Sequence, residues 1–263
     1  MLALVLGVAA AGLAVLLLRA RRRIGALERR LEAAGEGLET LQRAFSRFAP
    51  AEVVEDFIAK GTSHRSEKKE VTVLFADLKG FTALSEPLDP EVLVRIVNGY
   101  FERMSRAIRR HQGHVAEFIG DGILALFGAL EPNPWQTNDA GHAALAMRAA
   151  LEDYNTALRA EELPTLAMGV GVHRGTVVAG VFGNAELSKY GVIGSTVNLA
   201  ARTQGLTRVH GVDVLVTDAV AAVLEPRFRL RAMPPTAVKG VSTPLATFAL
   251  DGFAGEDAAL ARG

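Results

Sequence analysis

Residues 114–127 read HVAEFIGDGILALF, two apolar stretches on either side of a Gly-Asp-Gly turn. An Asp-Gly pair between runs rich in Val, Ile, Leu and Phe is typical of a tight β-hairpin. We therefore expect strands over 114–119 and 123–127, with Asp121 at the tip of the turn.

The segments on either side extend this hairpin into a domain. Upstream, residues 71–76 form a short apolar run suited to a buried strand, and residues 90–111 read as a long helix. Downstream we expect a helix over 137–159 and strands over 166–173 and 176–181. This order predicts an α+β fold with a ferredoxin-like βαββαβ core, an antiparallel sheet covered by helices. Beyond it we expect a helix over 195–206 and short strands near Asp213, Phe228 and Thr247.

The predicted topology brings two carboxylates together. A helical crossover makes the second strand parallel to the first, so both end at the same edge of the sheet. Asp77 follows the first strand and Asp121 closes the second. The chain has no cysteine and no clustered histidine, so this pair favours a hard cation such as Mg²⁺ or Mn²⁺ over zinc. Such ions serve phosphoryl transfer.

Two further groups of residues suit phosphate chemistry. Gly80, Phe81 and Thr82 lead into a predicted helix, where backbone N–H groups can hold a phosphate. Asn198 and Arg202 are four residues apart and share one face of the helix predicted over 195–206. An arginine there can stabilise charge on a transferring phosphoryl group, and the alternative is a solvated surface pair.

The N-terminus predicts a membrane anchor. Residues 1–18 contain no charged or polar side chain, and a helix of this length approaches the roughly 30 Å hydrocarbon thickness of a bilayer. Arginines at 19 and 21–23 follow it, so we expect an uncleaved single-pass helix in the inner, cytoplasmic membrane with the remaining chain in the cytoplasm. A signal peptide or a buried helix is the alternative.

A coiled-coil-like helix is predicted next, over 19–60. Three glycines weaken it, so it needs a partner helix, and an amphipathic helix packed on the domain is the alternative. The apolar residues alternate in steps of three and four, as in a coiled-coil seam. They are Ile24, Leu27, Leu31, Ala34, Leu38, Leu41, Phe45 and Phe48.

Composition excludes several classes of protein. The 263 residues allow one substantial domain with an appended segment, and 49% hydrophobic residues are enough for its core. The net charge of zero removes the electrostatic argument for a nucleic-acid partner. The chain has neither the GxxxxGK[ST] motif of a P-loop NTPase nor the GG[DE]EF motif of a diguanylate cyclase.

Three stretches resemble class III adenylate and guanylate cyclases, and they occur in the order found in that family. They are VTVLFADLKGFT (71–82), FIGDGILALFG (118–128) and YGVIGSTVNLAAR (190–202). The resemblance runs from about residue 71 to about residue 250. It implies a nucleotidyl cyclase domain over 61–251, followed by a tail over 252–263.

The resemblance also implies roles for individual residues. Asp77 and Asp121 bind two divalent metal ions, Mg²⁺ or Mn²⁺, with the Leu78 carbonyl assisting. Asn198 positions the ribose, and Arg202 steadies the transition state in which the 3′-hydroxyl attacks the α-phosphate and pyrophosphate leaves.

The family similarity further implies a homodimer with two composite sites. Each site takes its metal-binding aspartates from one subunit and its Asn/Arg pair from the other. Lys239, in the stretch AVKG, resembles a family lysine that contacts the terminal phosphates. Ser195 replaces an aspartate common in the third motif, and we expect it to cap the helix that follows.

Two positions favour GTP over ATP as the nucleoside triphosphate. Adenylate cyclases usually carry lysine four residues before the second metal-binding aspartate, whereas this chain carries Glu117. A carboxylate only accepts hydrogen bonds, which suits the N1–H and amino group of guanine. Gly191 offers a backbone N–H that can approach guanine O6. The alternatives are an adenylate or dual-specificity cyclase, with Glu117 turned toward an arginine, or an inactive nucleotide-binding module.

Overall fold

The computed structural model describes residues 25, 35, 66–183 and 188–254. The chain divides into two compact units after Gly61, and the fold below belongs to the second. The predicted anchor over 1–18 and nearly all of the predicted helix over 19–60 lie outside the described residues. Within the described ranges, no helix is long and apolar enough to cross a membrane.

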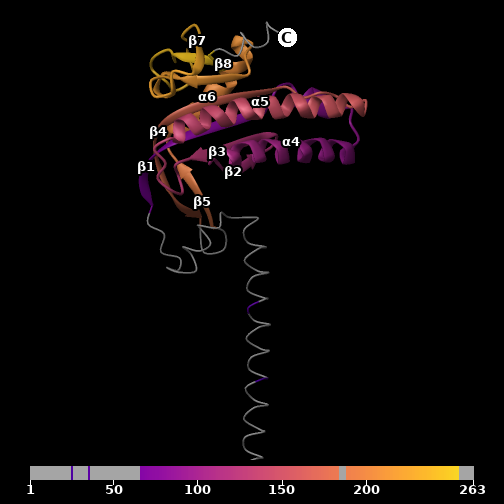
Figure 1. Ribbon diagram of the computed structural model, residues 1–263, viewed down its shortest axis with the longest axis horizontal. Coiled ribbons are helices and arrows are strands. Elements are labelled where there is room, and N and C mark those ends of the chain that lie inside the picture. Colours follow the sequence, from indigo (N-terminus) through magenta and orange to yellow (C-terminus); the bar gives the residue numbers. More distant parts are fainter. Residues whose placement is uncertain (1–24, 26–34, 36–65, 184–187, 255–263) are drawn as a thin grey trace, which may run out of the picture. The chain divides into compact units, whose positions relative to one another are not determined.

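Eight strands of the described part form one sheet, in the order β2-β3-β1-β4-β6-β8-β7, with β5 paired to β4 (Figure 1). The strands are β1 (Glu67–Leu78), β2 (His114–Ile119), β3 (Gly122–Phe127), β4 (Met168–Gly183), β5 (Ser188–Ile193), β6 (Val214–Thr217), β7 (Phe228–Ala232) and β8 (Thr247–Phe253). The helices are α3 (Phe81–Ser85), α4 (Pro90–Arg110), α5 (Gln136–Ala160), α6 (Ser195–His210) and α7 (Asp218–Ala221).

The predicted βαββαβ core is confirmed. The first four strands lie in the order β2-β3-β1-β4, and each neighbouring pair is antiparallel. The long helices α4 and α5 lie side by side along this sheet (Figure 1). They bury one face of β1 through Leu74 and Ala76, whereas Val71 and Val73 face the opposite side and pack with Ala200 of α6. Alternate residues of β1 therefore serve two separate cores.

Two predicted boundaries are wrong. The strands expected over 166–173 and 176–181 form one continuous strand, β4, which pairs with β1 from Leu78↔Met168 to Glu67↔Ala179. A polar Arg174-Gly175 step interrupts the apolar pattern, but the ladder to β1 keeps the backbone extended through it. Helix α6 continues past the predicted end to His210, because the first residue that ends the helix is Gly211, with a positive φ of 65°.

Three shorter elements were missed, and one predicted cap is wrong. The sequence pattern did not predict β5, α3 or α7, which are each six residues or shorter. The N-cap of α6 is Gly194, and Ser195 is already the first helical residue. Ser195 therefore does not occupy the capping position.

Strand β4 and helix α6 pack closely at Gly171. A Cβ at Gly171 would meet the backbone nitrogen of Gln204 and lie 2.6 Å from the carbonyl oxygen of Ala200. Both are backbone atoms, so Gly171→Ala has to push the helix off the sheet. We expect this substitution to lower the free energy of unfolding by roughly 2 to 4 kcal/mol, measured by urea denaturation.

The matched control for this prediction is Gly205→Ala on the same helix. A Cβ at Gly205 has no atom within 4 Å, so it gains helix propensity at no steric cost. We expect this variant to be as stable as the parent or more stable by up to about 1 kcal/mol. If both variants unfold at the same urea concentration, the close packing at Gly171 is contradicted.

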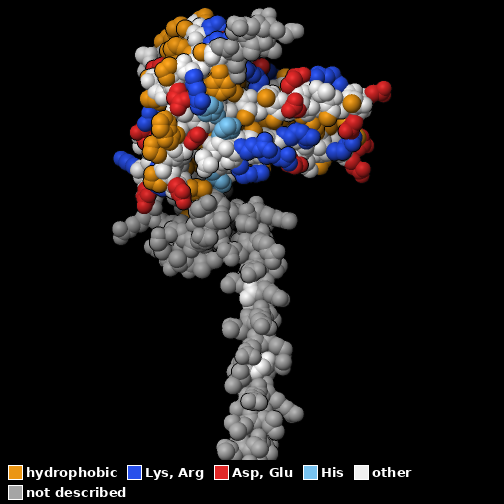
Figure 2. Space-filling model, viewed as in Figure 1, with side chains coloured by type: hydrophobic (Ala, Val, Ile, Leu, Met, Phe, Trp, Pro, Cys, Tyr) orange, Lys and Arg blue, Asp and Glu red, His pale blue; other side chains and the backbone are white. Residues whose placement is uncertain are grey.

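The viewed face of the domain carries basic and acidic side chains together (Figure 2). This mixture agrees with a net charge of zero. The absence of a nucleic-acid partner stays a prediction.

Candidate active site

Two carboxylates meet at one edge of the sheet, as the strand order predicted. Asp77 does not follow β1 as predicted but is its next-to-last residue, because the pairing with β4 extends β1 to Leu78. Asp121 lies in the turn between β2 and β3. The Asp121 Oδ2 atom accepts a hydrogen bond of 3.2 Å from the backbone N–H of Leu78. Gly120 turns the hairpin with a φ of 63°, a conformation that favours glycine. The structure thus brings Asp77, Leu78 and Asp121 together.

The Asp77 carboxylate lies against the base of the hairpin. A Cβ added at Gly122 would lie 3.5 Å from the Asp77 Oδ1 atom and 3.2 Å from the carbonyl oxygen of Ala76. A Cβ at this position would press on the backbone carbonyl oxygens of Ile119, at 3.1 Å, and Ala76, and would be in ordinary van der Waals contact with the carboxylate. The Gly-Asp-Gly turn thus keeps space open beside Asp77 as well as reversing the chain.

The pair is electrostatically strained. Burial, repulsion by Asp121 and a hydrogen bond between the two carboxyls together raise the pKa of Asp77 from 3.8 to about 6, against the lowering effects of Arg208 and the Leu78 N–H. The Asp77 side chain is still 27% exposed. A nearby cation stabilises the ionised form of a carboxyl group that is partly buried and faces a like charge.

Arg208 supplies such a cation, and the sequence analysis missed it. Its Nη2 atom donates to the Asp77 Oδ2 atom at 3.1 Å and to the Leu78 carbonyl oxygen at 2.9 Å. Arg208 lies in the last turn of α6, beyond the predicted end of that helix at 206. The available signal was Gly211, because a glycine stop there places Arg208 inside the helix.

The residues at this edge fit a hard divalent cation. Two carboxylates and a carbonyl are oxygen donors of the kind that Mg²⁺ and Mn²⁺ prefer. The positively charged guanidinium of Arg208 already contacts two of these oxygens. In the described ranges no three or more Asp, Glu, His or Cys side chains gather into a metal-binding group.

A second group of predicted residues lies on another side of α6. Asn198 is exposed, and Arg202 is half-buried. A Cβ at Gly240 would lie 3.1 Å from the Arg202 Nη2 atom, so the loop that carries Lys239 lies against Arg202. At 3.6 residues per turn, Arg202 and Arg208 point about 120° apart around the helix. Arg202 and the Lys239 loop thus meet on a different side of α6 from the Asp77 edge.

The predicted phosphate loop directly follows the carboxylate. Gly80 has a φ of 72° and precedes the five-residue helix α3, in which Phe81 and Thr82 are the first residues. The Nζ atom of Lys79 donates to the Asp213 Oδ1 atom at 2.8 Å and to the Val212 carbonyl at 3.0 Å. These bonds tie the start of the loop to the connection between α6 and β6.

The two predicted base-reading positions lie on different strands. Glu117 lies on β2 opposite Leu124, next to an irregularity in the ladder, and is half-buried. Gly191 lies on β5 and pairs with Gly180 of β4. Among the described residues, a Cβ at Gly191 would meet only a ring carbon of Phe182, at 4.0 Å. The structure therefore has room for a side chain at position 191.

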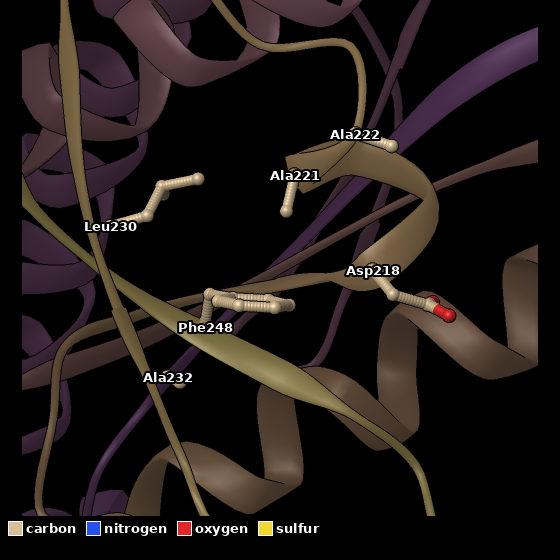
Figure 3. Close-up of a pocket in the computed structure, with 6 residues that line it drawn as sticks. All are labelled: Asp218, Ala221, Ala222, Leu230, Ala232 and Phe248. Carbon is tan, nitrogen blue, oxygen red and sulfur yellow. The ribbon is translucent and has the colours of Figure 1, made fainter. Parts of the chain in front are cut away.

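An apolar pocket of about 450 Å³ lies elsewhere (Figure 3). Its lining comes from α7, β7 and β8, and Asp218 is its one charged residue. Asp77 pairs with Gly169, which lies beside Val214 at the start of β6. Asp218 follows the other end of β6, which is Thr217. The pocket is thus at the other edge of the sheet. It lacks the converging polar groups of a nucleotide site.

Comparison with known proteins identifies the family. Residues 64–252 match the model of the adenylate and guanylate cyclase catalytic domain. Adenylate cyclase 1 of Rhizobium meliloti (strain 1021) is 34% identical over 203 residues, which are 76% of this chain and 30% of that relative. This chain therefore spans less than a third of that relative's length.

Solved structures agree with this match. The crystal structure of the guanylyl cyclase Cya2 is 33% identical with a TM-score of 0.66, covering 72% of this chain and 95% of that one. The adenylyl cyclase CyaB from P. aeruginosa is 27% identical with a TM-score of 0.67, covering 72% and 96%.

The fold and the carboxylate edge are those of a nucleotide-cyclising enzyme domain of class III. The chain belongs to the adenylate and guanylate cyclase catalytic domain family. Its similar proteins carry both names, adenylate cyclase and guanylyl cyclase. Family membership alone therefore leaves the choice of purine open.

Proposed function

We propose that this chain converts GTP to 3′,5′-cyclic GMP and pyrophosphate at the interface of a homodimer, using two divalent metal ions. The observation that carries the proposal is the strained pair of carboxylates, Asp77 and Asp121, beside the Leu78 carbonyl. Their excess negative charge and oxygen donors suit Mg²⁺ or Mn²⁺ bound together with a nucleoside triphosphate.

The metal-binding residues in this mechanism are Asp77, Asp121 and the Leu78 carbonyl. The chemistry that the ions supply when bound is a lower pKa of the 3′-hydroxyl and neutralisation of the leaving phosphates. The backbone N–H groups at Gly80, Phe81 and Thr82 hold the phosphate chain next to this edge. Lys239 adds a positive charge for the terminal phosphates.

The second group of residues completes the site from the other subunit. Asn198 orients the ribose and Arg202 donates to the α-phosphate, whose charge is greatest in the transition state. Their position on a different side of α6 from Arg208 and Asp77 supports a composite site, which a twofold dimer forms twice. In-line attack then depends on orientation and charge neutralisation, and no side-chain base is required.

Recognition of guanine is assigned to Glu117 and Gly191. The Glu117 carboxylate accepts from guanine N1–H and the amino group, and the Gly191 backbone N–H donates to O6. The main alternative, an adenylate cyclase, is favoured by the 34% identity to a relative of that name. An inactive nucleotide-binding module is less consistent with a chain that keeps Asp77, Asp121, Asn198 and Arg202.

The proposal is tested by giving the full chain equal concentrations of GTP and ATP with Mn²⁺ and identifying the cyclic product. We expect cyclic GMP in excess of cyclic AMP by about tenfold or more, because a mispaired buried polar group costs about 1 to 3 kcal/mol. An excess of cyclic AMP would establish the adenylate cyclase alternative. Absence of both products, with folded protein, would support the inactive module.

Substitution of the base-reading residues should change the purine. We expect Glu117→Lys combined with Gly191→Thr, or with Gly191→Asp, to move the ratio of kcat/KM for GTP and ATP toward ATP by about tenfold to a hundredfold. The open space beside Gly191 accommodates either side chain.

The matched control is Glu102→Lys, which makes the same charge change on the exposed surface of α4. It should leave the GTP to ATP ratio unchanged. Unchanged selectivity in the double variants would show that the base is read by other residues.

The N-terminal segments complete the proposal. Residues 1–18 anchor the chain in the inner membrane with the catalytic domain in the cytoplasm, and residues 19–60 pair as a coiled coil. Such pairing raises the effective concentration of one catalytic domain for the other. A chain lacking residues 1–60 would then need a higher protein concentration for the same specific activity.

A further inference from the structure

Arg208 holds the same oxygens that the proposed metal site needs. Its Nη2 atom lies 3.1 Å from the Asp77 Oδ2 atom and 2.9 Å from the Leu78 carbonyl oxygen. The third donor is coupled to these two, because Asp121 accepts from the Leu78 N–H and hydrogen-bonds to Asp77. One guanidinium group therefore touches two of the three candidate ligands directly and neighbours the third.

The arrangement is electrostatically complementary in the metal-free protein. Two carboxylates that share a site repel each other, and a cation on one of them offsets that repulsion. Arg208 provides this positive charge from the last turn of α6, where a cation also interacts favourably with the negative end of the helix dipole. A divalent ion on the same oxygens would add a like charge beside the guanidinium, so the two cations exclude each other.

The guanidinium can also move away. The Arg208 side chain is 54% exposed, and an exposed ion pair of this kind contributes little and exchanges readily with solvent. No core residue has to move when a flexible arginine swings into water, since its alkyl stem can remain on the surface of α6.

We propose that Arg208 is a displaceable internal cation that positions Asp77 and the Leu78 carbonyl in the metal-free enzyme and yields them to the first divalent ion. Arg208 thereby sets the metal concentration at which the site fills. This inference rests on the proposed metal site. Arg208 is a positioning residue, because it acts through Asp77 and Leu78 rather than on the substrate.

The direction of the metal affinity separates this role from a purely structural one. If Arg208 only supported the local fold, its loss would distort the ligands and weaken metal binding. If Arg208 competes with the metal, its loss strengthens metal binding. The same loss should also lower the unfolding temperature of the metal-free protein, because the carboxylates then repel each other without a counter-charge.

The experiment measures Mn²⁺ binding to the full chain without nucleotide, from the electron paramagnetic resonance signal of free Mn²⁺. We expect Arg208→Gln to lower the Mn²⁺ dissociation constant by about two- to fivefold, the range that corresponds to losing one exposed ion pair. Arg208→Met, which keeps an apolar stem for packing, should do the same. Arg208→Lys should bind Mn²⁺ as the parent does, because a single ammonium nitrogen can donate to both oxygens.

The matched control is Arg95→Gln. Arg95 pairs with Glu161 at 3.0 Å on an exposed surface, so this variant loses the same charge from the same kind of ion pair. It should leave Mn²⁺ affinity unchanged. Thermal unfolding provides the second readout: Arg208→Gln should melt below the parent in a chelator, and the difference should shrink or reverse when Mn²⁺ is added.

Two outcomes overturn the inference, and one overturns its foundation. Mn²⁺ binding that is unchanged or weaker in both Arg208→Gln and Arg208→Met would exclude displacement by the metal. Arg208→Lys binding as tightly as Arg208→Gln would exclude a role for the positive charge. If Asp77→Asn binds Mn²⁺ as well as the parent in either background, the metal site itself, and with it the proposed function, is wrong.

Discussion

Replacing Asp77 with alanine is expected to reduce cyclase activity by about a thousandfold or more, measured as cyclic nucleotide formed with saturating Mn²⁺. The site has only two carboxylates, and in the described ranges there is no cluster of three acidic or histidine side chains from which a substitute could come. Losing Asp77 therefore removes one of the two carboxylates of the proposed metal site.

A matched control is Asp251→Ala. Asp251 forms a carboxylate–arginine pair with Arg231, at 2.9 and 3.0 Å, just as Asp77 does with Arg208. Deleting it removes the same chemistry from the β7–β8 hairpin and should leave activity within about twofold, as surface changes away from a site usually do. Activity that survives Asp77→Ala would overturn the assignment of the metal site.

The isosteric variant Asp77→Asn separates function from stability. The pKa of Asp77 is raised from 3.8 to about 6. An acid whose pKa is higher in the folded than in the unfolded protein contributes stability at pH values below its unfolded pKa. That contribution is lost as the pH rises through the folded pKa of about 6, so ionised Asp77 lowers the stability at neutral pH. Asp77→Asn should therefore be inactive yet melt no lower than the parent at pH 7.5 without metal. A clearly lower melting temperature would contradict this sign.

Mixing two inactive variants should restore activity. We expect Asp77→Ala and Arg202→Ala to be inactive alone but to give about a quarter of the parental activity when co-expressed. Random pairing makes about half of the dimers mixed, and each mixed dimer has one complete site of two. That site takes Asp77 from the Arg202→Ala chain and Arg202 from the Asp77→Ala chain.

The matched control mixes Asp77→Ala with Asp121→Ala. Both residues belong to the group at the end of β1, joined through the Leu78 N–H, so no pairing of these chains yields an intact site. This mixture should remain inactive. Restoration in neither mixture would indicate that one chain contains the whole site, and the composite dimer would be wrong.

Much of the site was accessible from the sequence. The motifs around Asp77 and Asp121 identified both carboxylates, and the hairpin between β2 and β3 was predicted to within one residue. Local chemistry decides such features, because an Asp-Gly turn and alternating apolar residues act over a few residues. The convergence of the carboxylates was also predicted from the sequence, because a helical crossover makes β2 parallel to β1, so that both strands end at the same edge of the sheet.

Arg208 could not be assigned in this way. Nothing near Arg208 in the sequence distinguishes it from any other arginine in the last turn of a helix. Its contacts with Asp77 and Leu78 join residues far apart in the chain, and they arise only because α6 packs across the sheet at Gly171. The different directions of Arg202 and Arg208, by contrast, follow from their six-residue separation within α6.

By itself, the sequence determined the order of strands and helices in the βαββαβ core and the two aspartates, because these depend on local patterns and on motif identity. The preference for guanine that Glu117 and Gly191 indicate stays a prediction. Tertiary structure alone decided that β4 is one unbroken strand, since the pairing with β1 overrides the polar step at Arg174-Gly175. It also decided which cation lies on the carboxylates. Contacts between distant segments depend on how the elements pack, and that packing is not written in any single stretch of the chain.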